Sequence, residues 1–180
     1  MTSKKPSSQE TNSLASETVR KAFGHFASGV TIVTAVSPDG SNVGMTVSSF
    51  NSVSLDPPMV LWSAGTQAPE YGGFAVCKKF AVHVLSETQA ELSNRFATPD
   101  IDKFSGVDWQ LSEHGLPVIS SCPMCLQCET VNCHDAGDHK ILIGRVIEAD
   151  INSDEPPLLY YGSAYPVSYT HLTLPTICSV

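Results

Sequence analysis

The sequence predicts a mainly β domain with a few helices, built as a small antiparallel barrel. Three observations favour this fold class. Short runs rich in Val, Ile and Phe dominate the chain, turn residues such as Pro, Gly, Asn and Asp separate them at intervals, and helical patterns are few. A βαβ fold would instead alternate its strands with longer helical segments.

The first elements are a helix and a hairpin. Residues 1–13 are rich in Ser, Thr, Lys and Gln, which predicts a disordered lead-in. Ser16 can then cap an amphipathic helix that Gly29 can end. Two strand-like runs follow, residues 30–36 and residue 43 onward, and the turn sequence Pro38-Asp39-Gly40 joins them as a hairpin.

The later elements are mostly strands. "PPMVLWSAG" and "KKFAVHVLS" predict two further strands, and "SETQAELSNRFA" predicts a short helix with Ser86 as a possible cap. Two more strands are expected at about residues 124–131 and 139–150, around the turn at residues 135–138. No internal repeat or linker divides the chain.

Composition narrows the class of protein. The 180 residues are 42% hydrophobic, enough for the core of one domain. Eighteen acidic against 10 basic residues give a formal charge of −8, which argues against a nucleic-acid or anionic-membrane surface. The start of the chain has no apolar segment of the secretory type, so a cytoplasmic protein is expected, with its six cysteines as thiols or metal ligands.

Nucleotide-binding loops and metal sites have little support. The sequence contains neither a Gly-x-Gly-x-x-Gly run after a strand nor a P-loop. Cys122, Cys125, Cys128 and Cys133 are closely spaced, but residues three apart on a strand point to opposite faces, so Cys125 should face away from Cys122 and Cys128. Small buried thiols are therefore preferred, and a cysteine-based metal-binding interaction module stays as an alternative.

The segment "GMTVSSFNSVSLDPPMVLW", residues 44–62, is the most informative. Serines and threonines interrupt an apolar strand-like run, and polar groups inside a sheet need hydrogen-bond partners. They can face solvent, or they can line a site for a flat polar heterocycle with a phosphate tail. Among the histidines, His25 and His83 lie between apolar residues and are expected to be structural, whereas His139 begins a strand beside a loop.

Six ordered segments between Phe23 and Tyr165 resemble the short-chain flavin reductases, the reductase components of two-component flavin-dependent monooxygenases. They are "FGHFASGVTIVTA", "GMTVSSFNSVSLDPPMVLWS", "FAVHVLSETQAELSNRFA", "KFSGVDW", "GLPVI" and "AGDHKILIGRV". The resemblance implies an FMN-binding split barrel, usually a homodimer. It would use NADH or NADPH to reduce FMN or FAD for a separate oxygenase. A flavin binder of the same fold without reductase activity is the alternative.

The same resemblance implies roles for particular residues. Thr46, Val47, Ser48 and Ser49 would lie along the isoalloxazine edge, with Ser52 and Ser54 nearer the ribityl phosphate. Asn94, Arg95 and Phe96 would help to close the flavin site, with Arg95 as a phosphate partner. His139 matches a histidine expected near the nicotinamide. The cysteine-rich strand departs from the family pattern, and "YYGSAY" matches it only loosely, so Tyr165 has no assigned role.

The end of the chain looks foreign to the rest. Residues 167–180, within "PVSYTHLTLPTICSV", resemble a translated sequencing adapter, so residues 166–180 are expected to be a non-native tail. A genuine edge strand at residues 168–174 is the alternative. The predicted domain therefore covers residues 14–165, and Cys178 and His171 belong to no site.

Overall fold

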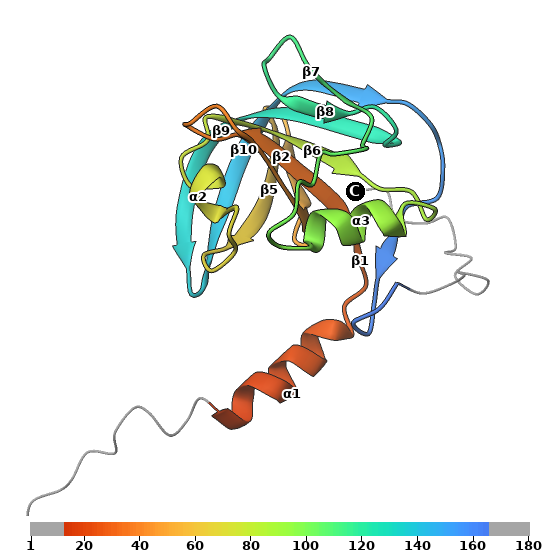
Figure 1. Ribbon diagram of the computed structural model, residues 1–180. Coiled ribbons are helices and arrows are strands. Elements are labelled where there is room, and N and C mark those ends of the chain that lie inside the picture. Colours follow the sequence, from red (N-terminus) through yellow and green to blue (C-terminus); the bar gives the residue numbers. More distant parts are fainter. Residues whose placement is uncertain (1–12, 166–180) are drawn as a thin grey trace, which may run out of the picture. The chain divides into compact units, whose positions relative to one another are not determined.

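The structure is a computed structural model that describes residues 13–165 (Figure 1). The expected lead-in, up to residue 12, and the expected non-native tail, residues 166–180, lie outside the described residues. The chain divides into two units. One comprises Met1–Ala27 with Tyr160–Val180, and the other comprises Ser28–Leu159.

The smaller unit contains the first helix, α1 (Ser13–Gly24). Ser16 is not its cap and Gly29 is not its end, because Ser13 is already helical and the chain leaves the helix after Gly24. The carbonyl of Gly24 accepts a hydrogen bond from the amide of Gly162 at 2.7 Å, which satisfies one of the orphan carbonyls at the helix end.

The larger unit is dominated by one seven-stranded sheet. Its strands pair in the order β3-β2-β6-β9-β10-β5-β4, and every pair is antiparallel, so the predicted mainly β antiparallel fold is confirmed. Their bounds are β2 (Thr31–Val36), β3 (Asn42–Val47), β4 (Asn51–Leu55), β5 (Pro58–Gly65), β6 (Lys79–Val84), β9 (Met124–Ala136) and β10 (His139–Ile151).

Connectivity requires this sheet to curl. Strands β3 and β4 lie at opposite edges of the sheet, yet only residues 48–50 separate them in sequence. In a flat sheet six strand spacings would place these edges about 29 Å apart. An extended chain from Val47 to Asn51 reaches only about 14 Å. The two edges must therefore approach each other, which makes the unit a barrel left open along a seam between β3 and β4.

Several smaller elements complete this unit. They are β1 (Ser28–Gly29), α2 (Tyr71–Phe74), α3 (Ala90–Ala97), β7 (Trp109–Leu111), β8 (Pro117–Ile119) and β11 (Leu159–Tyr160), the last of which runs into the smaller unit. The predicted hairpin at residues 38–40 is confirmed, and both predicted long strands after residue 124 are present. Ser86 does not cap α3. The N-cap is Gln89, and the Ser86 hydroxyl contacts that of Thr88 at 2.9 Å.

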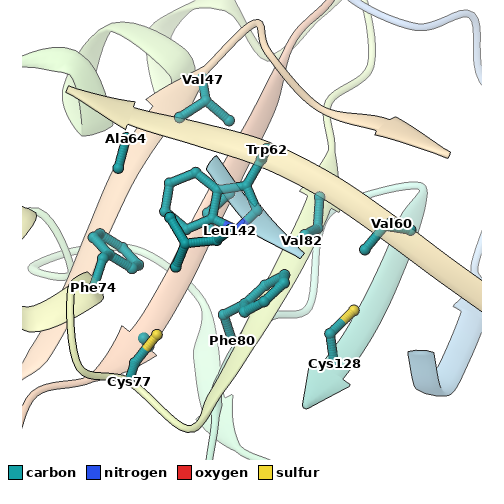
Figure 2. Close-up of a cluster of buried hydrophobic side chains, with 12 residues drawn as sticks. Val47, Val60, Trp62, Ala64, Phe74, Cys77, Phe80, Val82, Cys128 and Leu142 are labelled. Atoms are coloured by element: carbon teal, nitrogen blue, oxygen red, sulfur yellow. The ribbon is translucent and has the colours of Figure 1, made fainter. Parts of the chain in front are cut away.

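The barrel interior is filled by aromatic and aliphatic side chains (Figure 2). The Trp62 ring packs edge-on against Phe74 and Phe80, with ring centroids 5.1 and 5.8 Å apart. Glycine at position 144 leaves room for the Phe80 ring, which a β-carbon there would overlap. The indole Nε1 of Trp62 is buried without a hydrogen-bond partner among the described residues. Interdigitation of this kind fixes the barrel on which the loops are mounted.

The cysteines at the start of β9 are buried in hydrophobic clusters. Cys128 belongs to the main core, whereas Cys125 packs with Ala81 and Leu116, so the expected opposite orientation of these two thiols is confirmed. Burial raises the pKa of each to about 12, which keeps them protonated and unreactive. Among residues 13–165, no helix is long and apolar enough to cross a membrane.

Candidate functional site

The seam between β3 and β4 carries most of the predicted site residues. The Thr46 hydroxyl donates a hydrogen bond to the carbonyl of Ser93 on α3, at 2.6 Å. Val47 points into the core, and Ser48 is exposed. Side chains therefore alternate along β3 between the core and the outside of the barrel. Ser48, the residue after the strand, has its side chain on the outside, exposed to solvent.

Ser49 lies across the seam and bonds to the backbone of β5. Its hydroxyl accepts a hydrogen bond from the amide of Ser63 at 2.9 Å and donates one to the carbonyl of the same residue at 3.1 Å. These two hydrogen bonds take the place of strand pairing for the backbone of Ser63, at the point where β3 has ended and β4 has not begun. The hydroxyl retains one lone pair, so Ser49 can accept one further hydrogen bond.

Ser52 and Ser54 lie farther along the same edge. Both are on β4, opposite Val60 and Met59 of β5, with a register shift between them. Ser52 is exposed and Ser54 is half-buried. Strand β4 is the last in the sheet, so its outer backbone groups take no part in the pairing of the described strands. No charged side chain occurs between residues 44 and 55, so this surface offers small neutral donors and acceptors only.

Helix α3 packs on β3 through a contact that only glycine permits. A β-carbon at Gly44 would lie 2.5 and 2.7 Å from two ring carbons of Phe96, which is fully buried. Phe104 stacks edge-on against Phe96 with ring centroids 5.3 Å apart. The missing side chain of Gly44 therefore sets the height of α3 above the strand that leads into the seam.

The other two predicted residues on α3 are accessible. Asn94 is exposed, and Arg95 is half-buried with its Nη1 donating to the carbonyl of Asp102 at 3.2 Å. Within the described part of the chain, Arg95 is the one basic residue lining a cavity of about 360 Å³, whose other walls include Thr88, Gln89 and Ser121 and the acidic Glu91 and Asp108. Several donors of its guanidinium are not used by this bond, which suits an anionic group such as a phosphate.

Thr46 and Phe96 line a second cavity, of about 310 Å³, together with Glu70 and Lys103. Arg95 is not among its lining residues, and Thr46 is not among those of the first cavity. The structure therefore places these two predicted residues in separate cavities beside α3. A single ligand contacting both would have to extend from one cavity to the other.

His139 begins β10 at the tip of the long hairpin. Its Nδ1 lies 2.8 Å from the carboxylate of Asp138, and this hydrogen bond lowers the pKa of the Asp138 carboxyl. Asp138 is anchored in turn, because its carbonyl accepts bonds from the Thr66 amide at 2.9 Å and the Thr66 hydroxyl at 3.0 Å. These contacts hold the imidazole by one nitrogen and leave Nε2 available, 3.6 Å from where a β-carbon on Gly65 would lie.

Strand β5 brings His139 and Ser49 to the same end of the barrel. His139 is paired in register with Gly65, and Ser49 bonds to Ser63, two residues earlier on the same strand. Two residues of strand span about 7 Å. Ser54, opposite Met59, lies about 13 Å farther back along β5. The predicted nicotinamide and flavin-ring residues thus lie at the same end of β5, one on each side of that strand, and Ser54 lies farther along it.

Sequence reasoning assigned no role to Lys103 and Glu70. Lys103 lies in the quoted segment "KFSGVDW", in a polar stretch that is typical of an exposed loop, and nothing in the sequence indicates that it is buried. In the structure it forms an ion pair with Glu70, and both side chains are largely shielded from solvent. Only the fold brings these two charges together.

Comparison with known proteins identifies the fold and its relatives. Residues 23–168 match the family model described as the flavin reductase like domain. The chain is 44% identical over 150 residues to "FMN reductase (NADH) SmoA" of Agrobacterium fabrum, covering 83% of this chain and 84% of that protein. It is 42% identical over 147 residues to the reductase component of the flavin-dependent trigonelline monooxygenase of Acinetobacter baylyi. That match covers 82% of this chain and 47% of the relative, so the chain spans about half of it.

A solved structure agrees with these matches. The NADH:FAD oxidoreductase SgcE6 of Streptomyces globisporus, solved in complex with NAD and FAD fragments, superposes with a TM-score of 0.79 at 35% identity. The match covers 86% of this chain and 93% of that protein. The similarity therefore extends over nearly the whole domain.

Proposed function

The chain belongs to the flavin reductase like domain family, and on this basis we propose that it reduces FMN or FAD with NADH or NADPH and supplies the reduced flavin to a separate oxygenase. The relatives named above support the reaction, and the name of the Acinetobacter relative supports the oxygenase partner. The observation in the structure that carries the proposal is that Ser49 and His139 lie at the same end of β5, one on each side of it.

The reaction makes modest demands on the protein. A hydride passes from C4 of the nicotinamide to N5 of the flavin, which leaves an oxidised nicotinamide and a reduced flavin carrying new negative charge. The protein must stack two rings and place hydrogen-bond donors where that charge develops. The uncharged seam, with its small side chains and edge backbone groups, fits a flat heterocycle whose polar atoms are mostly acceptors.

The hydrogen bonds refine which groups would contact the flavin ring. The Thr46 hydroxyl is directed to Ser93, and the Ser49 hydroxyl donates to Ser63, so neither proton is available to a ligand in this arrangement. We propose that the ring is contacted by the Ser48 side chain and by the backbone of residues 48–50. Arg95 is the proposed phosphate partner.

His139 is proposed to orient the nicotinamide. Its ring is held by Asp138 through Nδ1, so Nε2 is the nitrogen presented toward the seam end of β5. Such a role needs a fixed position more than a proton transfer, which matches an imidazole secured on one side.

Assembly and location are part of the proposal. Exposed apolar side chains, Val53 and Leu55 on the edge strand β4 and Ile151 at the end of β10, support a homodimer, because they are costly to leave in water. The five cysteines within residues 13–165 are all free thiols, which supports a reducing compartment such as the cytoplasm.

The test is a turnover assay that crosses NADH and NADPH with FMN and FAD. Catalytic amounts of protein should oxidise many equivalents of nicotinamide when flavin is in excess, without oxygenase present. Flavin binding without nicotinamide oxidation in all four combinations would instead favour the flavin binder of the same fold. Binding of neither flavin would exclude both.

A further inference from the structure

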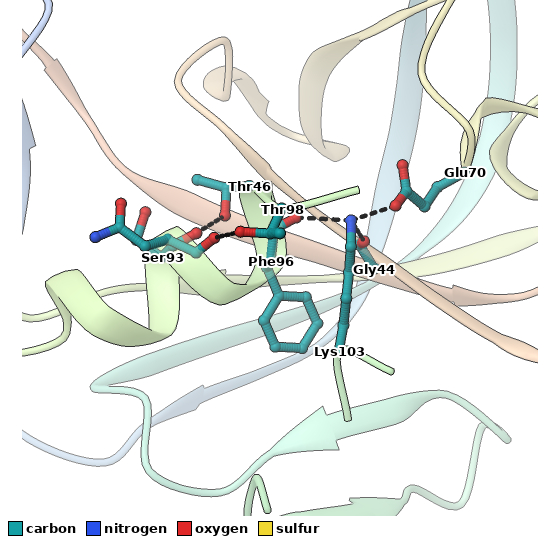
Figure 3. A network of polar contacts seen from close by, with 8 residues as sticks. Gly44, Thr46, Glu70, Ser93, Phe96, Thr98 and Lys103 are labelled. Carbon is teal, nitrogen blue, oxygen red and sulfur yellow. Dashed lines mark hydrogen bonds and ion pairs between the residues drawn. The ribbon is translucent and has the colours of Figure 1, made fainter. Parts of the chain in front are cut away.

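Lys103 is a buried ammonium group with three acceptors around it (Figure 3). Its Nζ donates to the carbonyl of Phe96 at 2.8 Å, to the carbonyl of Gly44 at 3.1 Å and to the carboxylate of Glu70. An ammonium has three donors, so this side chain is fully satisfied. Its side chain is only 7% exposed, and a lysine so deeply buried is retained in proteins only when it is paired.

The three acceptors belong to three different parts of the fold. Gly44 is on β3, Phe96 is in the last turn of α3, and Glu70 precedes α2. The carbonyl of Phe96 is among the four that a helix leaves unbonded at its end, where a positive charge is favourable. Lys103 therefore ties the end of α3 to β3, while Glu70 supplies the opposite charge.

Other contacts fix the same end of α3. The hydroxyl of Thr98 donates to the carbonyl of Asn94 at 2.8 Å, and the amide of Thr98 donates to the carbonyl of Arg95 at 3.2 Å. The Thr46 hydroxyl bonds to the carbonyl of Ser93. The carbonyls of residues 93 to 96 each accept one of these bonds. Two of the four donors, Thr46 and Lys103, lie outside the helix and its cap and so attach its last turn to the rest of the unit.

We propose that Lys103 is a positioning residue for the flavin site. Its bonds to the carbonyls of Phe96 and Gly44 fix the position of the last turn of α3, which carries Arg95, relative to β3, the strand that leads into the seam. This inference rests on the proposed function, in which Arg95 and the seam contact the same flavin. Because Arg95 is carried by α3 and the seam is not, a small rotation of this helix changes the separation between them.

The pair Lys103–Glu70 cannot be tested by one truncation. Removing only the lysine leaves a largely buried carboxylate without its partner, and the resulting loss of stability would hide any effect on the site. The double variant Lys103→Met/Glu70→Gln removes both charges and keeps similar volume. The two carbonyls then lose their donor while no buried charge is left unpaired.

In this double variant the KM for flavin should rise about tenfold or more, with the KM for nicotinamide within about threefold of wild type, since displacement of a binding group by about 1 Å has effects of this order. The circular dichroism of bound flavin should also change. The control is Arg145→Met/Glu129→Gln, which removes an exposed ion pair of 2.6 Å between β10 and β9 by the same two kinds of substitution. A flavin KM in the Lys103 double variant equal to that of the control would overturn the proposal.

A second variant tests the proposal if the double variant does not fold. Lys103→Arg keeps the positive charge opposite Glu70, but a planar guanidinium cannot direct donors to the same three acceptors. A folded Lys103→Arg protein should show the same selective rise in flavin KM, and an unchanged value would overturn the proposal. Wild-type protein is measured in parallel. If wild type itself binds no flavin, the proposed function fails, whereas a normal wild type with an unaffected variant refutes only the role of Lys103.

Discussion

His83 offers a test of the core through pH. The side chain is fully buried on β6, and both ring nitrogens are used. Nε2 accepts a hydrogen bond from the amide of Ile119 at 3.1 Å, so this nitrogen carries no proton. Nδ1 must then carry it, and it donates to the carbonyl of Ile32 at 3.1 Å. The folded protein therefore holds a neutral imidazole of one tautomer, as expected for a structural histidine.

The pKa of His83 sets how much the free energy of unfolding changes with pH. Burial lowers the pKa of His83 from 6.5 to about 4, although the bond to Ile32 opposes the shift. Between these two values the unfolded chain binds a proton that the folded chain does not, so stability falls as pH falls. A difference of about 2.5 pH units at 1.36 kcal/mol each gives about 3 kcal/mol. The full contribution is present above pH 6.5 and is lost by about pH 4.

The variant His83→Gln removes the titration while retaining a donor and an acceptor for the same two backbone groups. Urea unfolding at pH 7, 5.5 and 4.5 should give a free energy of unfolding that falls less steeply with acid in the variant than in wild type. His134→Gln, an exposed position on β9, is the control and should follow the wild-type curve. Equal pH dependence in wild type and His83→Gln would refute the argument.

Three further predictions concern the site. Gly44→Ala should cost about 1–3 kcal/mol in urea unfolding, because its β-carbon would lie 2.5 Å from the Phe96 ring, whereas Gly72→Ala, with open space around it, should cost nothing. A Gly44→Ala protein as stable as wild type would show that α3 can move freely. Ser49→Ala should cost about 1–2 kcal/mol of stability and also raise the flavin Kd, because both bonds across the seam are lost. An unchanged flavin Kd would remove this residue from the site. His139→Ala should lower the reduction rate or raise the nicotinamide KM, with flavin Kd within a few-fold. Normal kinetics at both limiting and saturating NADH would leave His139 with a structural role only.

Features set by neighbouring residues could be predicted from the sequence. In the hairpin turn, the Asp39 carboxylate accepts bonds from the Ser41 amide and hydroxyl, at 3.0 and 2.6 Å, and Gly40 adopts a φ of +85°. Both are local properties of these residue types. The orientation of Cys125 against Cys128 follows in the same way from the two-residue period of a strand.

Features set by distant residues could not be predicted. The polar run after residue 43 contains two strands, and the break at residues 48–50 exists because the curled sheet brings β5 within reach of Ser49. Lys103 likewise occurs in a segment whose composition is typical of solvent-exposed loops. Its burial depends on Glu70 and on two backbone carbonyls. Most of these partners are distant in sequence, so the spacing of polar and apolar residues does not reveal them.

The serines and threonines of the seam show how hydroxyls predicted to contact a ligand can have partners within the fold. Their density predicted a ligand because buried hydroxyls need partners. In the structure the Thr46 and Ser49 hydroxyls find those partners in the backbone of α3 and β5. These bonds hold open an edge at which β3 and β4 do not pair, and so leave backbone groups of residues 48–50 outside the strand pairing of the sheet. The hydroxyls therefore shape the site, and we infer that the backbone they expose, with Ser48, does the binding.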